Sequence, residues 1–272
     1  MQKSKTGGNM IPKEQFIEDL NKVRESAPLI HNITNYVVMN ITANALLSIG
    51  ASPVMAHARE EMQEMVSIAS ALIINIGTLS EKWIEAMHIA GKAAKEMNKP
   101  VILDPVGAGA TTLRTQTTKE IIEEVKPDVI RGNASEILAI AKAHSSTKGV
   151  DSTASSKEAV NVAKELANDT GAVISISGAT DFITDGSTLN EVSFGHPLMG
   201  KITGTGCTAS ALSGAFAAVN SNYLVASTEA MMTMGIAGEM AAEQAEAPGT
   251  FLIKFLDALY KIDENEIRKK IK

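Results

Sequence analysis

The sequence has few of the residues that mark disulfide-rich, metal-rich or aromatic-rich proteins. A single cysteine, Cys207, excludes an internal disulfide framework and a cysteine-rich zinc site. The five histidines are scattered and show no spacing typical of metal ligands. Aromatic residues make up only 4% of the chain, so Ile, Leu, Val, Met and Ala must form the core, with the 13 methionines as adaptable filler.

The chain also lacks an excess of positive charge. It carries 25 Lys and Arg against 31 Asp and Glu, a net charge of −6. No basic stripe exists that would neutralise phosphates along a nucleic acid, so we expect no nucleic-acid partner. An anionic ligand must instead be held locally, by a helix N-terminus, a metal ion or one or two arginines.

No segment is typical of secretion or membrane insertion. The first dozen residues lack the apolar stretch of a signal peptide, and we expect a flexible leader at 1–12 followed by a single domain at 13–272. Residues 202–228 carry no charge and exceed the length of a spanning helix, yet they contain several Gly and Asn among many Ser and Thr. Two tightly packed helices explain this stretch better, so we expect a soluble, cytoplasmic protein without membrane contact.

Short apolar runs alternate with amphipathic segments through most of the chain. Strands are expected near 29–30, 53–56, 71–76, 101–103, 129–130 and 173–176, and helices at 80–98, 118–125 and 157–166. This rhythm predicts an α/β fold with a mainly parallel sheet and helices on both faces. Around the turn Asp185-Gly186, residues 182–184 and 189–194 predict antiparallel edge strands. Four helices (207–219, 224–245, 251–260 and 264–271) close the chain, and 143–156 is expected to be a surface loop.

Ligands of such sheets bind beyond the carboxyl ends of the strands, so the polar residues there matter most. The first candidate is Gly204-Thr205-Gly206-Cys207, which opens a helix and offers backbone N–H groups to an anion. A glycine-rich turn into a packed helix is the alternative. At this helix N-terminus the pKa of Cys207 is expected to fall, and the thiol is a candidate nucleophile, weak base or inert small hydrophobe.

Two further candidates follow apolar runs. Asp104 precedes a glycine-rich turn and is suited to magnesium water or to a polyphosphate, although an Asp-Pro turn with a threonine cap fits equally. Arg131 offers phosphate a planar fork of donors. Asn133 and Glu136 have the spacing of a capping box, while Glu136 is also a candidate for the magnesium hydration shell.

The N-terminal third holds the last candidates. Asn35 lies in the segment HNITN, and Met55 ends the segment GASPVM. A small heteroaromatic ligand would suit a soft Met side chain and an Asn hydrogen bond. Both are more often ordinary loop residues.

Together these segments resemble the hydroxyethylthiazole kinases of the ribokinase-like superfamily. The matching stretches are HNITNYVVMNITANALLSIGASPVMAHA, INIGTLS, VILDPVGAGAT, RGNASEI, GVDS and TGTGCTASALSGAFAAV, in family order over roughly residues 28 to 245. The resemblance implies phosphorylation of the hydroxyl of 4-methyl-5-(2-hydroxyethyl)thiazole by ATP with Mg2+, in thiamine biosynthesis and salvage. It also implies a homotrimer with active sites between subunits.

The resemblance also implies roles for particular residues. Asn35, Met55 and Gly204 would contact the thiazole, Arg131 and Ser177 would contact ATP, Asp104 and Glu136 would serve magnesium, and Gly204, Thr205, Gly206 and Cys207 would form the anion hole. Related sugar and vitamin kinases have an aspartate where this family has Cys207. Ser177 stands where we expect threonine, which makes its ATP contact less secure.

Three other functions are compatible with the residues. Cysteine-dependent acyl transfer would need a base beside Cys207, with His196 or His57 as candidates. A ligand-binding sensor would keep the fold without turnover. A kinase acting on another vitamin-precursor alcohol, such as a pyrimidine or pyridoxal-like compound, is the nearest alternative.

Overall fold

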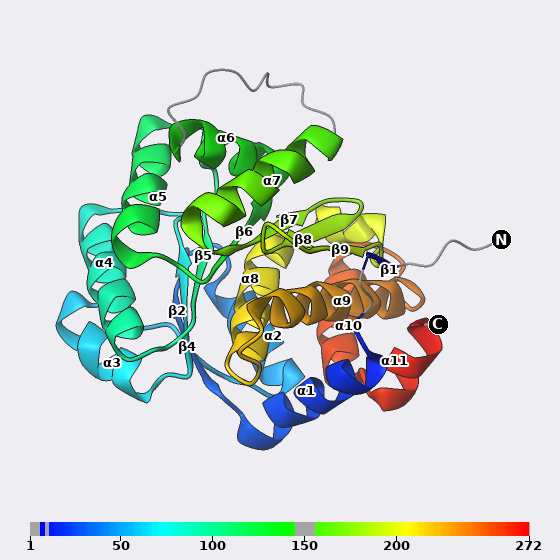
Figure 1. Cartoon of the computed structure of the whole chain (residues 1–272). Coiled ribbons are helices and arrows are strands. Elements are labelled where there is room, and N and C mark those ends of the chain that lie inside the picture. Colours follow the sequence, from blue (N-terminus) through cyan, green and yellow to red (C-terminus); the bar gives the residue numbers. More distant parts are fainter. Residues whose placement is uncertain (1–5, 9–10, 145–155, 272) are drawn as a thin grey trace.

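The strands join into one sheet of nine strands (Figure 1). The computed structural model describes residues 6–8, 11–144 and 156–271. In chain order the strands are β1 (Thr6–Gly8), β2 (Leu29–Ile33), β3 (Ser52–Val54), β4 (Ala71–Asn75), β5 (Val101–Asp104), β6 (Val129–Asn133), β7 (Val173–Ser177), β8 (Asp181–Thr184) and β9 (Leu189–Val192). They lie in the order β1-β9-β8-β7-β6-β5-β4-β2-β3, and the six from β7 to β3 are parallel. The predicted α/β class with a mainly parallel sheet is confirmed.

Helices connect the parallel strands and close the chain. They are α1 (Lys13–Ser26), α2 (Met39–Ile49), α3 (Met62–Ile68), α4 (Glu81–Glu96), α5 (Thr112–Val125), α6 (Ala134–His144), α7 (Ser156–Thr170), α8 (Thr205–Ala217), α9 (Tyr223–Ala242), α10 (Pro248–Lys261) and α11 (Glu264–Lys270). Two short 3-10 helices, η1 (Arg59–Glu61) and η2 (Pro197–Lys201), lie in loops.

Alternate residues of the central strands face two separate cores. Ile73 of β4 belongs to the core that α1, α2 and α8 to α11 help to form, whereas its neighbours Leu72 and Ile74 belong to the core that α3 to α7 help to form. The β-strand period of two therefore divides one apolar run between the two faces of the sheet. The expected helices on both faces are present (Figure 1).

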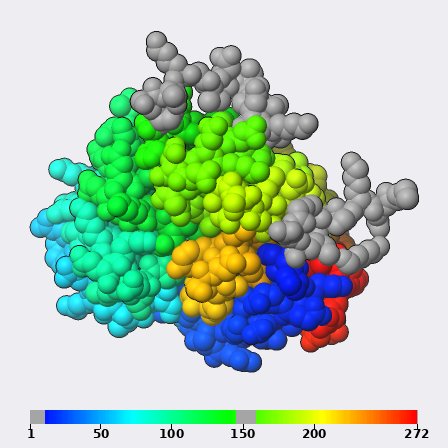
Figure 2. All heavy atoms as spheres, in the orientation of Figure 1, coloured from blue at the N-terminus to red at the C-terminus, as the bar shows by residue number. Residues whose placement is uncertain are grey.

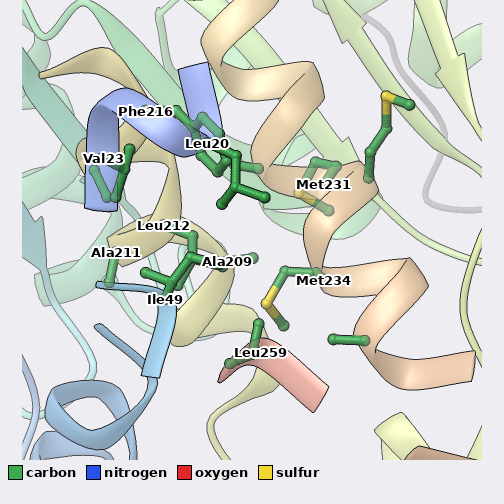
Figure 3. Packing of buried hydrophobic residues seen from close by; sticks show 14 of the residues in the cluster. Leu20, Val23, Ile49, Ala209, Ala211, Leu212, Phe216, Met231, Met234 and Leu259 are labelled. Atoms are coloured by element: carbon green, nitrogen blue, oxygen red, sulfur yellow. The ribbon is translucent and has the colours of Figure 1, made fainter. Parts of the chain in front are cut away.

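The larger core contains the methionines expected as filler. Met231 and Met234 of α9 lie among Leu20 of α1 and Leu212 and Phe216 of α8 (Figure 3). Both methionines are almost fully buried. A flexible thioether side chain fills the irregular space between these helices without a bulky ring.

The antiparallel edge of the sheet contains the predicted hairpin and one strand that was not predicted. Strands β8 and β9 form the predicted hairpin around Gly186. Thr6–Gly8, inside the segment expected to be a flexible leader, pair antiparallel with β9 as strand β1. Helices α1 and α11 lie side by side, blue and red in Figure 2, where Arg268 Nη1 donates to Glu14 Oε1 over 2.7 Å.

Several boundaries differ from the sequence-based expectation. Helix α5 begins at Thr112 rather than at 118, because the Thr111 side chain caps it by accepting from Arg114 N. Helices α1, α2 and α3 were not predicted, and α6 was indicated only by the capping-box spacing of Asn133 and Glu136 at its start. Most of the loop expected at 143–156, including GVDS at 149–152, lies outside the described residues. No helix in the described part of the chain has the length and apolar character that crossing a bilayer requires.

Candidate active site

The parallel strands bring polar side chains together at their carboxyl ends. β4 ends in Asn75, β5 in Asp104 and β7 in Ser177, while Arg131 lies near the end of β6. Asn75 pairs with Asp104 in the register of neighbouring strands. Asn35, two residues after β2, reaches the same edge and donates to Asn75. Five strands distant in sequence thus supply one polar cluster, as the open-sheet rule predicts.

Asp104 lies at the base of this cluster and is 1% exposed. Its Oδ2 accepts hydrogen bonds from Asn75 Nδ2 and Ser210 Oγ, each over 2.8 Å. Burial raises the pKa of Asp104 to about 6, while Arg131 and the two hydrogen bonds oppose the shift. The nearby charge of Glu136 raises it further. Two carboxylates therefore face one space, and a cation there would relieve their repulsion.

Cys207 lies in the first turn of α8, as predicted, but its predicted acidity is wrong. Burial, and then the charge of Asp104, raises the pKa of the thiol to about 11. Hydrogen bonds from Asn75 and Asn35 oppose the shift without cancelling it, and Asn35 Nδ2 lies 3.5 Å from Sγ. Loss of solvation outweighs the helix N-terminus, because the thiolate would be nearly enclosed beside a carboxylate. At neutral pH this cysteine is a neutral thiol.

The N-terminus of α8 forms the expected backbone cradle. Gly204 adopts a φ of 90°, which favours glycine, and its C=O accepts the first helical hydrogen bond from Thr208 N. The N–H groups of Thr205, Gly206 and Cys207 precede that bond and have no partner within the helix. The Thr205 hydroxyl donates to Met199 O, which ties the turn to η2. These N–H groups and the helix dipole suit an anion.

Arg131 packs closely against this cradle. Its guanidinium Nη1 lies where it would be 2.7 Å from a Cβ added at Gly206, so only glycine lets the backbone approach so near. The side chain is 7% exposed, and its Nε has no hydrogen-bond partner among the described residues. A buried arginine with an unused donor is a strong candidate for an anionic ligand.

Glu136 and Asn133 form the capping box that the spacing predicted. Asn133 Oδ1 accepts from Glu136 N over 2.9 Å, and Glu136 Oε2 accepts from Asn133 N over 2.8 Å. Glu136 Oε1 also accepts from Gly107 N, which joins the start of α6 to the glycine-rich turn after β5. The carboxylate is therefore fixed by two backbone N–H groups, one on each oxygen, at the edge of the cluster.

Two cavities meet at this cluster. The smaller, of about 460 Å³, is lined by Asn35, Asp104, Arg131, Glu136, Ser177 and residues 203–207, with further loop residues. The larger, of about 660 Å³, extends between the β7–β8 turn, η2 and α9, with Phe194, Met231 and Met234 among its apolar lining. Arg131, Ser177, Thr205 and Gly206 line both cavities. They mark the junction of the two cavities.

Met55 is the one candidate that the structure does not bring to the cluster. It follows the edge strand β3 and lines neither cavity. The other candidates (Asn35, Asp104, Arg131, Glu136, Ser177, Gly204, Thr205, Gly206 and Cys207) all line the smaller cavity. Among the described residues, no group of three or more His, Cys, Asp or Glu side chains is arranged to hold a metal ion.

Sequence reasoning missed three residues that organise this cluster. Asn75 and Ser210 hold the Asp104 carboxylate, as described above. Arg114 of α5 donates to the carbonyls of Ile76 and Val106 from Nη1 and of Gly77 from Nη2, over 2.6 to 3.0 Å. It thereby joins the loops after β4 and β5. An Asn at the end of a fully buried apolar strand was the available signal for Asn75.

The fold is ribokinase-like. A ribokinase-like superfamily protein from Enterococcus faecalis V583 matches with a TM-score of 0.64 and 12% identity, over 94% of this chain and 93% of that one. At this identity the likeness concerns the fold alone. It nevertheless gives the molecule its class, an α/β protein with its polar cluster at the carboxyl edge of the sheet.

Within that class, the chain belongs to the hydroxyethylthiazole kinase family, whose family model matches residues 20–265. A hydroxyethylthiazole kinase of Leptospira biflexa is 56% identical over 94% of this chain and 96% of that protein. One from Syntrophus aciditrophicus is 55% identical over 92% and 93%. A solved hydroxyethylthiazole kinase structure from Pyrococcus horikoshii matches with a TM-score of 0.88 and 47% identity, over 94% of this chain and 96% of that one. The resemblance stated from the motifs is confirmed, and the chain is an enzyme of the kinase class.

Proposed function

We propose that this chain transfers the γ-phosphoryl group of ATP to the hydroxyl of 4-methyl-5-(2-hydroxyethyl)thiazole, a step of thiamine salvage. Relatives named hydroxyethylthiazole kinase at 50–56% identity support the substrate. The structural observation that carries the proposal is the position of Arg131 and the α8 N-terminus, at the junction of two cavities. Phosphoryl transfer needs such a junction, because donor and acceptor must meet in line.

The two cavities suit the two substrates. ATP would occupy the larger one, where Phe194, Met231 and Met234 offer an apolar surface to a flat base. Its phosphates would then reach Ser177 and Arg131 at the junction. The thiazole alcohol would occupy the smaller cavity, beside Asn35, Gly204 and Cys207.

Asp104 and Glu136 would serve Mg2+. Magnesium in phosphotransferases is usually held by one or two carboxylates together with waters and substrate phosphates, so the lack of a larger acidic group among the described residues is compatible with it. Asp104 Oδ1 takes part in none of the described hydrogen bonds, whereas both Glu136 oxygens already accept from backbone N–H groups. The free Oδ1 of Asp104 therefore suits direct contact with the ion, and the occupied oxygens of Glu136 suit contact through a water molecule. When bound, the ion would offset phosphate charge.

Direct, in-line transfer without a phosphocysteine fits the state of Cys207. A thiol with a pKa of about 11 is a poor nucleophile at neutral pH. Because phosphoryl transfer has a loose transition state, the acceptor hydroxyl needs little prior deprotonation. The N–H groups of Thr205, Gly206 and Cys207 and the Arg131 guanidinium would bear the charge that develops on the transferred group. Cys207 itself would be a neutral wall of the acceptor cavity.

Met55 would reach the thiazole only from another subunit. It lines neither cavity of its own chain, while the family resemblance implies a homotrimer with active sites between neighbours. We therefore propose that Met55 completes the acceptor cavity of an adjacent copy. A cytoplasmic location is likewise proposed from the family.

The acyl-transfer alternative finds no support at Cys207. His57 packs on the Trp83 ring, and His196 accepts from Leu198 N at the start of η2. Neither lines the cavity that holds the thiol. Neither histidine that the sequence offered as the base is therefore a described neighbour of Cys207.

Release of ADP from Mg-ATP tests the proposal, with hydroxyethylthiazole, hydroxymethylpyrimidine, pyridoxal or no acceptor. We expect ADP only with the thiazole alcohol, together with its phosphate ester identified by mass spectrometry. ADP with another alcohol would change the substrate but keep the reaction. Thiazole binding without ADP from folded, ATP-binding protein would favour a sensor.

A further inference from the structure

Asn75 lies between the proposed acceptor residue Asn35 and the proposed metal residue Asp104. It ends strand β4 within the motif INIGTLS and is 1% exposed. It lines neither cavity, so it would not touch a substrate. Its side chain nevertheless contacts both neighbours: Oδ1 accepts from Asn35 Nδ2 over 2.9 Å, and Nδ2 donates to Asp104 Oδ2 over 2.8 Å.

A backbone donor fixes which end of the Asn75 amide is oxygen. Gly77 N donates to Asn75 Oδ1 over 3.0 Å, and a peptide N–H only donates. If the Asn75 amide were flipped, its NH2 group would face the Gly77 N–H and the Asn35 NH2 group. Its oxygen would face the Asp104 carboxylate. Three contacts therefore allow one orientation.

That orientation in turn determines the orientation of Asn35. Since Asn75 presents an oxygen, Asn35 must present its NH2 group, and its own Oδ1 accepts from Val37 N over 3.1 Å. The same Asn35 NH2 group reaches Cys207 Sγ at 3.5 Å. The Asn35 amide at the acceptor cavity therefore has its orientation determined from strand β4, with its second hydrogen directed at Cys207.

The other end of Asn75 determines how Asp104 faces the cavity. Asn75 and Ser210 both donate to Oδ2, and the described hydrogen bonds leave Oδ1 for the cavity. A carboxylate held by two donors on one oxygen keeps a single rotamer in a buried site.

We propose that Asn75 is a positioning residue that aligns the acceptor cavity and the metal-binding carboxylate with each other. The inference rests on the proposed function and adds a residue that acts through Asn35 and Asp104. The Asn75 amide thereby sets the orientation of the Asn35 amide and leaves Oδ1 of Asp104 free to face the cavity. The distance between alcohol and phosphate then depends on one buried side chain.

Two substitutions separate the two halves of the amide. Asn75→Asp keeps an acceptor for Asn35 and Gly77 but places a carboxylate against Asp104. We expect kcat to fall roughly 10- to 100-fold, the effect of one lost charged hydrogen bond, with KM for the alcohol changed less than about threefold. Asn75→Ala removes both halves, so kcat should fall and KM for the alcohol should rise roughly tenfold.

A double variant supplies the rescue. Asn75→Asp with Asp104→Asn restores a donor–acceptor pair with the polarity reversed, because the new amide at position 104 would donate to the new carboxylate at position 75. We expect it to recover the melting temperature that Asn75→Asp loses and to keep the wild-type affinity for the alcohol, measured by calorimetry without nucleotide. Turnover should stay low because the charge at position 104 is gone. Because the affinity is measured without nucleotide, this part of the test does not depend on turnover.

Asn190→Ala is the matched control. Asn190 of β9 is another buried asparagine, 4% exposed, and its Nδ2 donates to Thr228 Oγ1 with a donor–acceptor distance of 3.1 Å. Asn190 lines neither cavity. It should lower the melting temperature without changing kcat or KM. If the Asn75 variants behave like this control, or if the double variant loses alcohol binding, the positioning role is overturned. An inactive wild type would instead count against the proposed substrate, and the comparison would then use whichever alcohol releases ADP.

Discussion

A buried carboxyl group away from the active site should control how stability varies with pH. Glu229 of α9 is fully buried, and neither of its oxygens has a donor among the described residues. Its neighbour Asp19 of α1 is also fully buried and accepts from Lys22, Gln15 and Asn220. Only a protonated Glu229 gains a partner, by donating its own hydrogen to Asp19.

The magnitude follows from the pKa. Burial, and then the charge of Asp19 and the hydrogen bond to it, raises the pKa of Glu229 from 4.5 to about 10. The folded protein therefore holds a proton here that the unfolded chain loses above pH 4.5, so the contribution of Glu229 to stability is greatest below 4.5 and falls as the pH rises toward 10. Each unit costs about 1.4 kcal/mol, which amounts to about 3 kcal/mol by pH 7.

Glu229→Gln removes this dependence. The amide has nearly the same shape, still donates to Asp19 and has no proton to lose. We expect the variant to be more stable than the wild type by about 1 to 3 kcal/mol at pH 7, the lower value allowing for imperfect burial of the amide. Urea unfolding followed by circular dichroism at pH 6, 7, 8 and 9, at one protein concentration, measures both the gain and the slope.

The slope of the free energy of unfolding against pH shows whether Glu229 is protonated in the folded protein. The free energy of unfolding of the wild type should fall with pH across this range, and that of Glu229→Gln should fall less steeply by up to about 1.4 kcal/mol per unit. Glu243→Gln, which changes an exposed carboxylate just beyond the same helix, should leave the wild-type slope intact. Parallel slopes for Glu229→Gln and wild type would refute a protonated Glu229.

Three further substitutions test the active site. Cys207→Ala should slow turnover less than about tenfold, whereas Cys207→Asp should retain or improve it, because the native thiol is already neutral; complete loss in both, with ATP binding intact, would point to an obligatory thiolate. Gly206→Ala would place a Cβ 2.7 Å from Arg131 Nη1, so KM for ATP should rise at least about tenfold in steady-state assays, and an unchanged KM would contradict the close approach. Arg114→Ala loses three hydrogen bonds to loop carbonyls and should cost roughly 2 to 4 kcal/mol in urea unfolding along with a lower kcat, with partial recovery in Arg114→Lys.

Much of the fold was predictable because its determinants are local. The buried runs at 71–76 and 101–103 have the length and composition of central strands, and they form β4 and β5 in the middle of the sheet. Helices α1, α2, α3 and α6 were harder. Helix α6, for example, follows β6 without any intervening loop, so no turn residue separates the two periods.

The cluster was predictable to the extent that polar residues at strand ends must meet. The opposite shift of the Cys207 pKa was not predictable, because the helix N-terminus is visible in sequence whereas enclosure beside Asp104 is a property of packing. Arg114 was missed for a similar reason. Its three acceptors are backbone carbonyls, which carry no residue-type signature.

The uncharged segment that resembles a membrane span is what brings the cradle to the cluster. Helix α8 lies directly on the sheet, and a Cβ added at Gly214 would come within 2.4 Å of Ile73 Cδ1. Small residues thus let the helix axis approach β4 more closely than Leu or Ile would allow. Since α8 is rigid, the same approach at Gly214 determines where its first turn stands relative to the ends of β4 and β5. A larger residue at position 214 would therefore move the Thr205, Gly206 and Cys207 N–H groups away from Asp104, although it lies more than one turn from any of them.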